Sequence, residues 1–342
     1  MPVHDMPHAH LGTGESETKN PANSPTNESQ IETDSGDQVG AIDPYDSATD
    51  FPDPLVSGEP VEVSEGVFVI PDGRRPFVPN VGIVLGGHSA LVIDTGIGPA
   101  NGVAVLEHAR RLCGHRRLYL ALTQVDPGHG FGAQAFKGCA TIIYSEAQQY
   151  RLRHLAASYV PTFESLGPTV ARRLAGLKLV DCDVSYGQRM ELDLGGTQAL
   201  LQDWGPAHTV DDQTIRIDDR VLFGGDLFET RMFPILPYFP PFDTHFDARR
   251  WMDALDRLIA NPPEVVVPGH GEVTTVELIT AVQEHLRYML DQVHHSWTAG
   301  TPVMEAAASI TKDVCTIWSN WHGPRNIRHM VTALYDQFDR ER

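Results

Sequence analysis

The sequence predicts an α/β fold in which two strand-rich halves, each covered by helices, form a four-layer αββα sandwich. Short apolar runs bounded by Gly-rich turns occur in two groups, at residues 61–93 and 190–223, and such runs are typical of β-strands. Longer segments between and after these groups carry apolar residues at helical spacing. An alternation of strands and helices builds sheets with helices packed on their faces.

The first 53 residues differ in composition from the rest of the chain. They are rich in Ser, Thr, Asn, Pro and Gly, and they contain eleven Asp and Glu but one Lys, which is about half of the net charge of −19. Such a segment buries too little apolar surface to offset its ordering entropy. We therefore expect a disordered acidic tail at 1–53, a main domain at 54–273 and a helical extension at 274–342.

The elements of the main domain can be placed in chain order. Strands are expected at residues 61–63, 67–70, 81–85, 90–93 and 117–122, with a helix at 103–112. A mainly helical region is expected at 144–177, followed by strands at 190–194, 198–201, 214–217 and 221–223. A helix at 247–260 and a strand at 264–267 complete the sandwich, and helical segments at 273–297, 302–318 and 324–342 form the extension.

Composition excludes several classes of partner. The acidic balance, with a pI near 5.1, argues against a nucleic-acid or anionic membrane surface. No apolar run reaches the length of a membrane span, and the N-terminus lacks the basic start and apolar core of a secretory signal. The four cysteines are scattered without a C-x-x-C pair, which favours reduced thiols. We expect a cytoplasmic protein with a small-molecule substrate, and a homodimer stays open beside a monomer.

Four polar loops each follow an apolar run and carry candidate site residues. Residues 122–133 bring Gln124, Asp126 and His129 directly after a predicted strand. Three later loops place one side chain each beyond a strand: His208, Asp226 and His270. Imidazole and carboxylate groups gathered at strand ends are the donors that a metal site in a layered α/β protein requires.

This series of motifs resembles the metallo-β-lactamase fold superfamily over roughly residues 61–273. Asp94-Thr95-Gly96 resembles the first motif of that family, and residues 124–129 stand at its second motif, H-x-H-x-D-H. The third, fourth and fifth motifs are matched by His208, Asp226 and His270. The resemblance implies a four-layer αββα sandwich of the metallo-β-lactamase type, and it implies that Asp94 braces the ligand loops by hydrogen bonds.

The second motif departs from the family pattern. Gln124 and Asp126 stand where the family has His, Gly128 stands where it has Asp, and His129 is kept. Transferred by position, the first metal of the family would meet four residues here: Gln124, Asp126, His208 and Asp226.

The second metal of the family would meet His129, Asp226 and His270, and Gly128 would contribute no ligand. We therefore expect one divalent metal, Zn²⁺ or Fe²⁺/Mn²⁺, centred on these three side chains, with Asp126 and His208 nearby. The alternative is a metal-free pocket in which the histidines are hydrogen-bonding groups.

Two loops supply candidate substrate contacts. In the family, the hairpin loop that corresponds to residues 71–77 overhangs the site, so Arg74, Arg75 and Phe77 are candidates, with a solvated loop as the alternative. Residues 233–242 hold too many Pro and aromatic residues for a regular element. We expect them to form a stiff apolar pocket rim that contacts substrate through Phe233 and Tyr238.

The resemblance implies a metal-dependent hydrolase that lowers the pKa of a bound water. The expected substrate is an ester, thioester, lactone or amide of a fairly hydrophobic small molecule, with Asp126 and His208 as the candidate catalytic residues. Two alternatives stay open. One is a non-hydrolytic enzyme (a lyase, isomerase, cyclase or oxygen-using enzyme) with one metal or none, and the other is a binding protein whose catalytic site has decayed.

Overall fold

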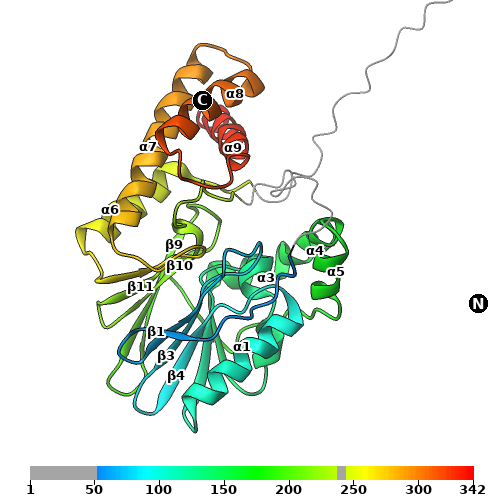
Figure 1. Ribbon diagram of the computed structural model, residues 1–342, viewed down its shortest axis with the longest axis vertical. Coiled ribbons are helices and arrows are strands. Elements are labelled where there is room, and N and C mark those ends of the chain that lie inside the picture. The colour runs from blue at the N-terminus through cyan, green and yellow to red at the C-terminus, as the bar shows by residue number, and fades with distance from the viewer. Residues whose placement is uncertain (1–51, 237–243) are drawn as a thin grey trace, which may run out of the picture. The chain divides into compact units, whose positions relative to one another are not determined.

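A computed structural model describes residues 52–236 and 244–342, and its strands form two sheets (Figure 1). The first sheet has the order β1 Val61–Ser64, β2 Val67–Ile70, β3 Val81–Leu85, β4 Ser89–Ile93, β5 Arg117–Ala121, β6 Thr141–Ser145 and β7 Val184–Tyr186. The second has the order β12 Val265–Val267, β11 Val221–Phe223, β10 Asp212–Ile217, β9 Gln198–Gly205 and β8 Arg189–Asp193.

The two sheets pack face to face because their strands carry apolar residues on both sides. In β4, Leu91 and Ile93 join the core between the sheets, where they share a cluster with Ile215 of β10. Their neighbours Ala90 and Val92 point to the opposite face and join a second core under the helices. Alternate side chains of a strand point to opposite faces of a sheet, so this strand must be apolar throughout.

Helices cover the outer face of each sheet, which confirms the predicted αββα sandwich. The first sheet is covered by residues of α1 Gly98–Cys113, α3 Glu146–His154, α4 Ala156–Ser165 and α5 Pro168–Leu174. The second is covered by α6 Ala248–Ala260, whose Trp251 and Leu255 share a core with Leu222 and Val266. Shorter helices lie in the loops: α2 Pro127–Gly130, η1 Ala133–Phe136 and η2 Gly225–Leu227.

The region at 144–177 is mainly helical as predicted, but the structure corrects both of its ends. Tyr144 belongs to strand β6, and the helices that follow end at Leu174. Strand β6 pairs in parallel on both sides, with β5 and with β7. A strand buried on both faces has no polar alternation, so its apolar run Ile142-Ile143-Tyr144 does not stand out from a buried helix. Strand β7 is only three residues long and was not predicted.

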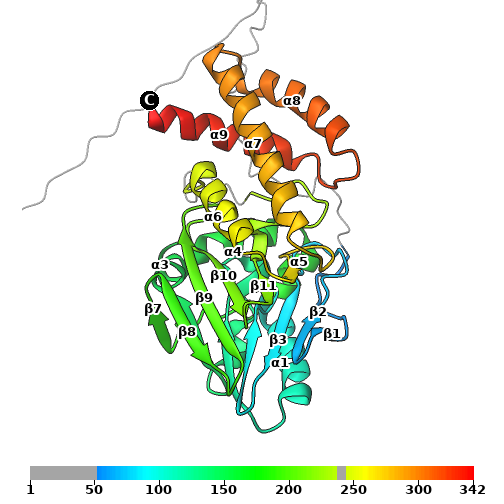
Figure 2. The same ribbon diagram turned by 90° about the vertical axis from the view of Figure 1, so that its left-hand side faces the viewer.

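Three long helices follow the sandwich: α7 Glu277–Thr298, α8 Val303–Ile317 and α9 Asn326–Glu341. Figure 2 shows α7 leading from the sandwich towards α8 and α9. Their apolar faces form one continuous cluster with α6 and the second sheet, which includes Met289 of α7 and Leu334 of α9. Within the described residues, no helix is long and apolar enough to cross a membrane.

The helical extension also holds the chain that follows η2, here named the connecting segment (residues 231–236). His322 and Met232 form a parallel bridge, and the amide of Phe233 donates to the carbonyl of His322 over 3.0 Å. The side chain of Asn326 donates to the carbonyl of Phe233 over 2.9 Å. The connecting segment is therefore anchored by residues almost a hundred positions later in the chain.

Candidate metal centre

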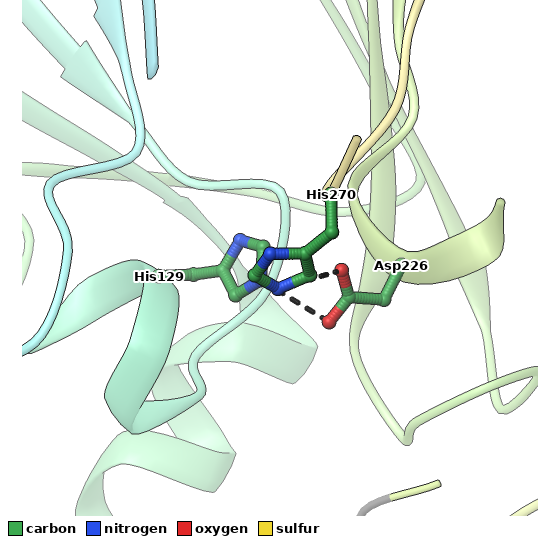
Figure 3. Close-up of side chains that lie close together, drawn as sticks. All are labelled: His129, Asp226 and His270. Atoms are coloured by element: carbon green, nitrogen blue, oxygen red, sulfur yellow. Dashed lines mark hydrogen bonds and ion pairs between the residues drawn. The ribbon is translucent and has the colours of Figure 1, made fainter. Parts of the chain in front are cut away.

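Three buried side chains from three separate loops meet at one point of the sandwich: His129, Asp226 and His270. His129 lies in α2 after strand β5, Asp226 lies in η2 after β11, and His270 follows β12. One ligand atom from each lies within 4.8 Å of the other two. Figure 3 shows His129 reaching this point from the side opposite Asp226 and His270.

The ring of His129 is fixed by a carboxylate behind it. Its Nδ1 donates to Oδ2 of Asp94 over 3.0 Å, and its Nε2 lies 3.1 Å from Oδ2 of Asp226. Asp94 also accepts hydrogen bonds from the backbone and the hydroxyl of Thr123, both over 2.7 Å. Asp94 has a φ of 66°, a left-handed conformation that ends strand β4 abruptly and turns the carboxylate towards the neighbouring loop.

The ring of His270 has a similar arrangement. Its Nε2 lies 3.7 Å from Oδ1 of Asp226, and its Nδ1 lies 3.8 Å from Oδ2 of Asp72. Each of the two rings thus has a carboxylate behind its Nδ1 and directs Nε2 at Asp226. In metalloproteins, a carboxylate behind a ligating histidine fixes the ring orientation and makes the other nitrogen a better donor.

The buried charges of the cluster shift the pKa values of its two imidazoles and of its carboxyl group. Burial opposes the charged form of His129, but the carboxylates of Asp226 and Asp94 outweigh it and raise the pKa of this imidazole well above its usual value. Burial also lowers the pKa of His270, but the charge of Asp226 opposes burial, and the pKa of this imidazole is raised as well. Although burial favours a neutral Asp226, His129 and His270 hold the pKa of its carboxyl far below the usual range.

These residues fit one divalent cation. Oδ1 of Asp226 is buried and has no hydrogen-bond partner among the described residues, and a buried carboxylate oxygen without a partner is costly unless something binds it. Two imidazole nitrogens and a carboxylate are a donor set for Zn²⁺, Fe²⁺ or Mn²⁺. A cation requires neutral imidazole, so it and protons compete for the same ring nitrogens.

The comparisons with known proteins bear on the fold of the chain. The family model of the metallo-beta-lactamase superfamily matches residues 189–270, which include Asp226 and His270. A metallo-beta-lactamase from Pontibacter korlensis superposes with a TM-score of 0.53 at 20% identity, covering 68% of this chain and 99% of that one. The chain has the metallo-β-lactamase fold.

Larger parts of the chain match two other proteins of this fold. A metallo-beta-lactamase family protein from Thermus thermophilus gives a TM-score of 0.59 at 16% identity and covers 82% of this chain and 95% of that one. A stereoselective inverting sec-alkylsulfatase from Pseudomonas sp. gives a TM-score of 0.61 at 13% identity and covers 82% of this chain and 50% of that one. A search of curated proteins found no match.

Three residues stand at the other metal position of the metallo-β-lactamase fold, and each has a hydrogen-bond partner within this chain. The amide of Gln124 donates to Oδ2 of Asp226 over 2.7 Å. Asp126 caps α2, where its Oδ1 accepts from the amide of Gly128 over 2.9 Å, and burial raises the pKa of its carboxyl. Nε2 of His208 donates to the carbonyl of Ile235 over 2.6 Å. Gln124 thus contacts the three-residue cluster through Asp226, whereas Asp126 and His208 are not among the members of that cluster.

The environment of His208 is that of a charged imidazole. Its Nδ1 faces Oδ1 of Asp212 at 3.6 Å, and the ring is 1% exposed. Burial opposes its protonation, but Asp212 outweighs burial and raises the pKa of His208 to about 9. Metal ligation by His208, and catalysis by His208 and Asp126, stay predictions from the sequence.

Gly128 occupies the position of the missing ligand and could carry a larger side chain. Its backbone is not left-handed. A Cβ atom there would lie 3.4 Å from Oδ1 of Asp126 and 3.7 Å from the carbonyl of Phe77, which are ordinary contact distances. The glycine is therefore not required by sterics, so its presence is a chemical difference from the family motif.

The predicted substrate contacts have varied surroundings. Arg74 pairs with Glu272, and Arg75 donates to the hydroxyl of Ser57 over 2.8 Å. Phe77 packs edge-on against Phe163 with ring centroids 5.5 Å apart.

Of the two substrate contacts predicted in residues 233–242, only Phe233 lies within the described residues. Phe233 is 1% exposed, lies in the core of the helical extension and packs against the rings of His285 and Trp321. Tyr238 and most of the predicted apolar rim lie outside the described residues.

Glu229 is a site residue that the sequence did not reveal. It is 1% exposed, its Oε2 accepts from the amide of Ile235 over 3.4 Å, and its Oε1 has no hydrogen-bond partner in the described part of the chain. Burial and the nearby charge of Asp226 raise the pKa of this carboxyl to about 8. The sole signal in the sequence is its position three residues after Asp226, in a loop that already carried a candidate ligand.

Proposed function

We propose that this protein is a hydrolase that uses one divalent metal ion held by His129, Asp226 and His270. Its substrate is an ester, thioester, lactone or amide of a fairly hydrophobic small molecule. The observation that carries the proposal is the buried cluster itself, in which both imidazoles direct Nε2 at the carboxylate of Asp226. One oxygen of that carboxylate, Oδ1, has no hydrogen-bond partner among the described residues. The metallo-β-lactamase fold supports a metal-dependent reaction but names no substrate.

The contacts around the cluster suggest a role for each residue in the proposed reaction. A bound cation would supply a Lewis acid that lowers the pKa of a water molecule. Asp94 and Asp72 hold the two rings, and Asp226 supplies the negative charge that a cation requires. His208 presents a buried positive charge next to this cluster, where it can stabilise negative charge that develops on a substrate oxygen. Asp126 is the nearby carboxyl that can accept a proton.

The contacts of Gln124 and His208 support one metal ion. Oδ2 of Asp226 accepts a hydrogen bond from the amide of Gln124, at the position where the family has a second cation. Nε2 of His208 donates to the carbonyl of Ile235 and so does not face that position as a free ligand. A second cation would have to displace both hydrogen bonds, and Gln124 offers only a weak amide oxygen in exchange.

A non-hydrolytic enzyme on the same site is the second candidate. The observation that favours it is Gly128, which leaves out the carboxylate that orients water in the hydrolases of this fold. A lyase, isomerase or cyclase must keep water from its bound substrate, so the absence of that carboxylate would suit such a reaction.

Elemental analysis of protein purified without added metal tests the proposal. We expect about one divalent metal per chain, loss of that metal in His270→Ala, and ester or thioester hydrolysis that stops in chelator and returns with Zn²⁺ or Mn²⁺. Two tightly held zinc ions per chain would contradict the single site. Activity that persists in chelator, in protein without metal, would refute the metal-dependent mechanism.

A further inference from the structure

We infer that Asn80 and Asp72 are positioning residues that orient the ring of His270 towards Asp226 and thereby set the affinity of the site for its cation. Both lie in the loop between β2 and β3, about two hundred residues before His270 in the sequence. The inference rests on the proposed metal site and extends it to two residues that make no direct contact with the cation.

Asn80 ties down the loop of His270 on both sides of the histidine. Its Nδ2 donates to the carbonyl of Pro268 over 3.0 Å and to the carbonyl of Gly271 over 2.8 Å. Its own backbone amide donates to the carbonyl of Gly269 over 2.8 Å. The side chain is 3% exposed, so water has little access to compete for these carbonyl groups.

Asp72 connects Asn80 with the imidazole of His270. Its backbone amide donates to Oδ1 of Asn80 over 3.0 Å, so Asn80 fixes Asp72 as well as the histidine loop. One carboxylate oxygen, Oδ2, accepts from the amide of Gly271 over 3.0 Å and lies 3.8 Å from Nδ1 of His270. The carboxylate is thus held where it defines which way the ring faces.

The histidine loop needs such external anchors because it has no regular structure of its own. It begins after Val267, the end of β12, and Gly271 has a φ of 88°. The loop also packs tightly on its other side, since a Cβ at Gly269 would lie 2.0 Å from Oδ1 of Asp226. A ligand on a loop keeps its geometry only if surrounding contacts fix the loop, and Asn80 and Asp72 supply those contacts from the first half of the sandwich.

Asn101 offers a matched control because it makes the same kind of contacts away from the site. It is fully buried, its Oδ1 accepts from the amide of Val56 over 2.9 Å, and its Nδ2 donates to two carbonyl groups, of Pro54 over 2.7 Å and of Ile97 over 3.0 Å. Asn101→Ala therefore removes as many side-chain hydrogen bonds to backbone as Asn80→Ala.

The experiment compares the full-length protein with Asn80→Ala, Asp72→Asn and Asn101→Ala. Zinc dissociation constants are measured by competition with a chromophoric chelator, and thermal midpoints are measured in excess chelator. We expect both alanine variants to lose thermal stability without metal. Only Asn80→Ala and Asp72→Asn should weaken zinc binding, by about 10- to 100-fold. Asp72→Asn keeps an acceptor for the amide of Gly271, so it reports on orientation with little risk of unfolding.

Two outcomes would overturn the inference, and they differ in what else they refute. Zinc affinity that is unchanged in Asn80→Ala and Asp72→Asn, with wild-type protein binding zinc, would reduce the pair to a structural anchor and leave the proposed metal site intact. Wild-type protein that binds none of Zn²⁺, Fe²⁺ and Mn²⁺ would refute the metal site and the positioning role together.

Discussion

At the scale of single residues, the site pairs each histidine with a carboxylate at Nδ1. His129 has Asp94 at 3.0 Å and His208 has Asp212 at 3.6 Å, and Asp72 plays the same part for His270. A carboxylate near Nδ1 helps to fix the orientation of a buried imidazole ring. In His129 and His270 the carboxylate lies behind Nδ1 while Nε2 faces Asp226. In His208, Nε2 donates instead to the carbonyl of Ile235.

Gly128 gives the first prediction at this scale. Because a Cβ fits there without close contacts, Gly128→Asp should fold and restore the carboxylate of the family motif. If the protein is a hydrolase, we expect metal affinity to rise by about tenfold, which is about 1.4 kcal/mol, and turnover of a generic ester to increase. Metal content and ester hydrolysis are measured on the same samples.

Gly128→Ala is the matched control, since alanine adds bulk without a ligand. A Gly128→Asp variant that binds metal more tightly but loses its native activity and gains hydrolysis would argue for the lyase, isomerase or cyclase alternative. Equal rates in the wild type and both variants would make Gly128 a neutral turn residue.

The sequence predicted the candidate ligands better than their surroundings. His129, Asp226 and His270 each follow a strand, and a strand end restricts where a side chain can lie, so their meeting could be expected. Asp72, Asn80 and Glu229 could not be assigned in this way, because their contacts depend on how distant loops approach one another. The same limit applies to His208, whose hydrogen bond to Ile235 is invisible in a motif.

At the scale of elements, helix α7 carries an unusual buried histidine. His285 is 1% exposed, and neither ring nitrogen has a hydrogen-bond partner among the described residues. Three aromatic rings surround it, those of Phe233, Trp318 and Trp321, with centroids 4.9 to 5.5 Å away. Burial alone lowers the pKa of His285 to about 3.

This histidine should make the folded protein sensitive to acid. Below about pH 6.5 the unfolded chain binds a proton at His285, while the folded protein stays neutral there until about pH 3. The free energy of unfolding should therefore fall with falling pH across this window, by about 2 kcal/mol at pH 5 relative to pH 7 from this residue. His285→Leu should lack that part of the decrease.

Urea unfolding of both proteins at pH 5 and pH 7, in excess chelator, measures the difference. His329, whose pKa burial lowers to about 4, contributes in the same direction to both proteins and cancels in the comparison. An identical pH dependence in wild type and variant would show that His285 is protonated, or reached by water, in the folded state.

Elements with a clear period were predictable, whereas those without one were not. Helix α6 has Trp251, Leu255 and Leu258 on one buried face, at helical spacing, and it begins one residue after its N-cap Asp247. Strand β6 lies between parallel partners and has no alternation to detect. Alternation of polar and apolar residues is visible only where one face of an element is exposed to solvent, and strand β6 of the first sheet has no such face.

At the scale of the whole molecule, residues 53–56 already contact the sandwich ahead of its first strand. Asp53 pairs with Arg173 of α5, and Val56 is 2% exposed in the core of the first half. The amide of Val56 also donates to Asn101 of α1. Most of the predicted acidic tail, residues 1–51, lies outside the described residues.

The effect of N-terminal deletions on the thermal midpoint should therefore change sharply between residues 51 and 57. We expect deletion of residues 1–51 to leave the thermal midpoint unchanged, because that composition offers little apolar surface to bury. Deletion of residues 1–57 should lower the midpoint by several degrees, since it removes the buried Val56, worth about 2 kcal/mol, and its hydrogen bond. A large fall for the shorter deletion would mean that the acidic segment packs on the domain.

The order of motifs was enough to predict the sandwich, because the metallo-β-lactamase fold fixes where each strand end must lie. The packing of the helical extension was beyond such an argument. Amphipathic helices at 273–342 indicate that one face will be buried, but not against what, and the contacts of His322 and Asn326 with the connecting segment depend on tertiary structure alone.

The spread of the three ligands along the chain has a consequence for the order of synthesis. His129 belongs to the first half of the sandwich, whereas Asp226 and His270 belong to the second. A growing chain exposes His270 only after nearly the whole sandwich has left the ribosome, so no cation can gather the three ligands before then. The core under the first sheet, whose residues run from Val56 to Leu174, can therefore assemble without a cation. Zinc fingers differ, because they stay unfolded until metal binds. Metal supply would then bear on the activity of the proposed site and not on the folding of this first half.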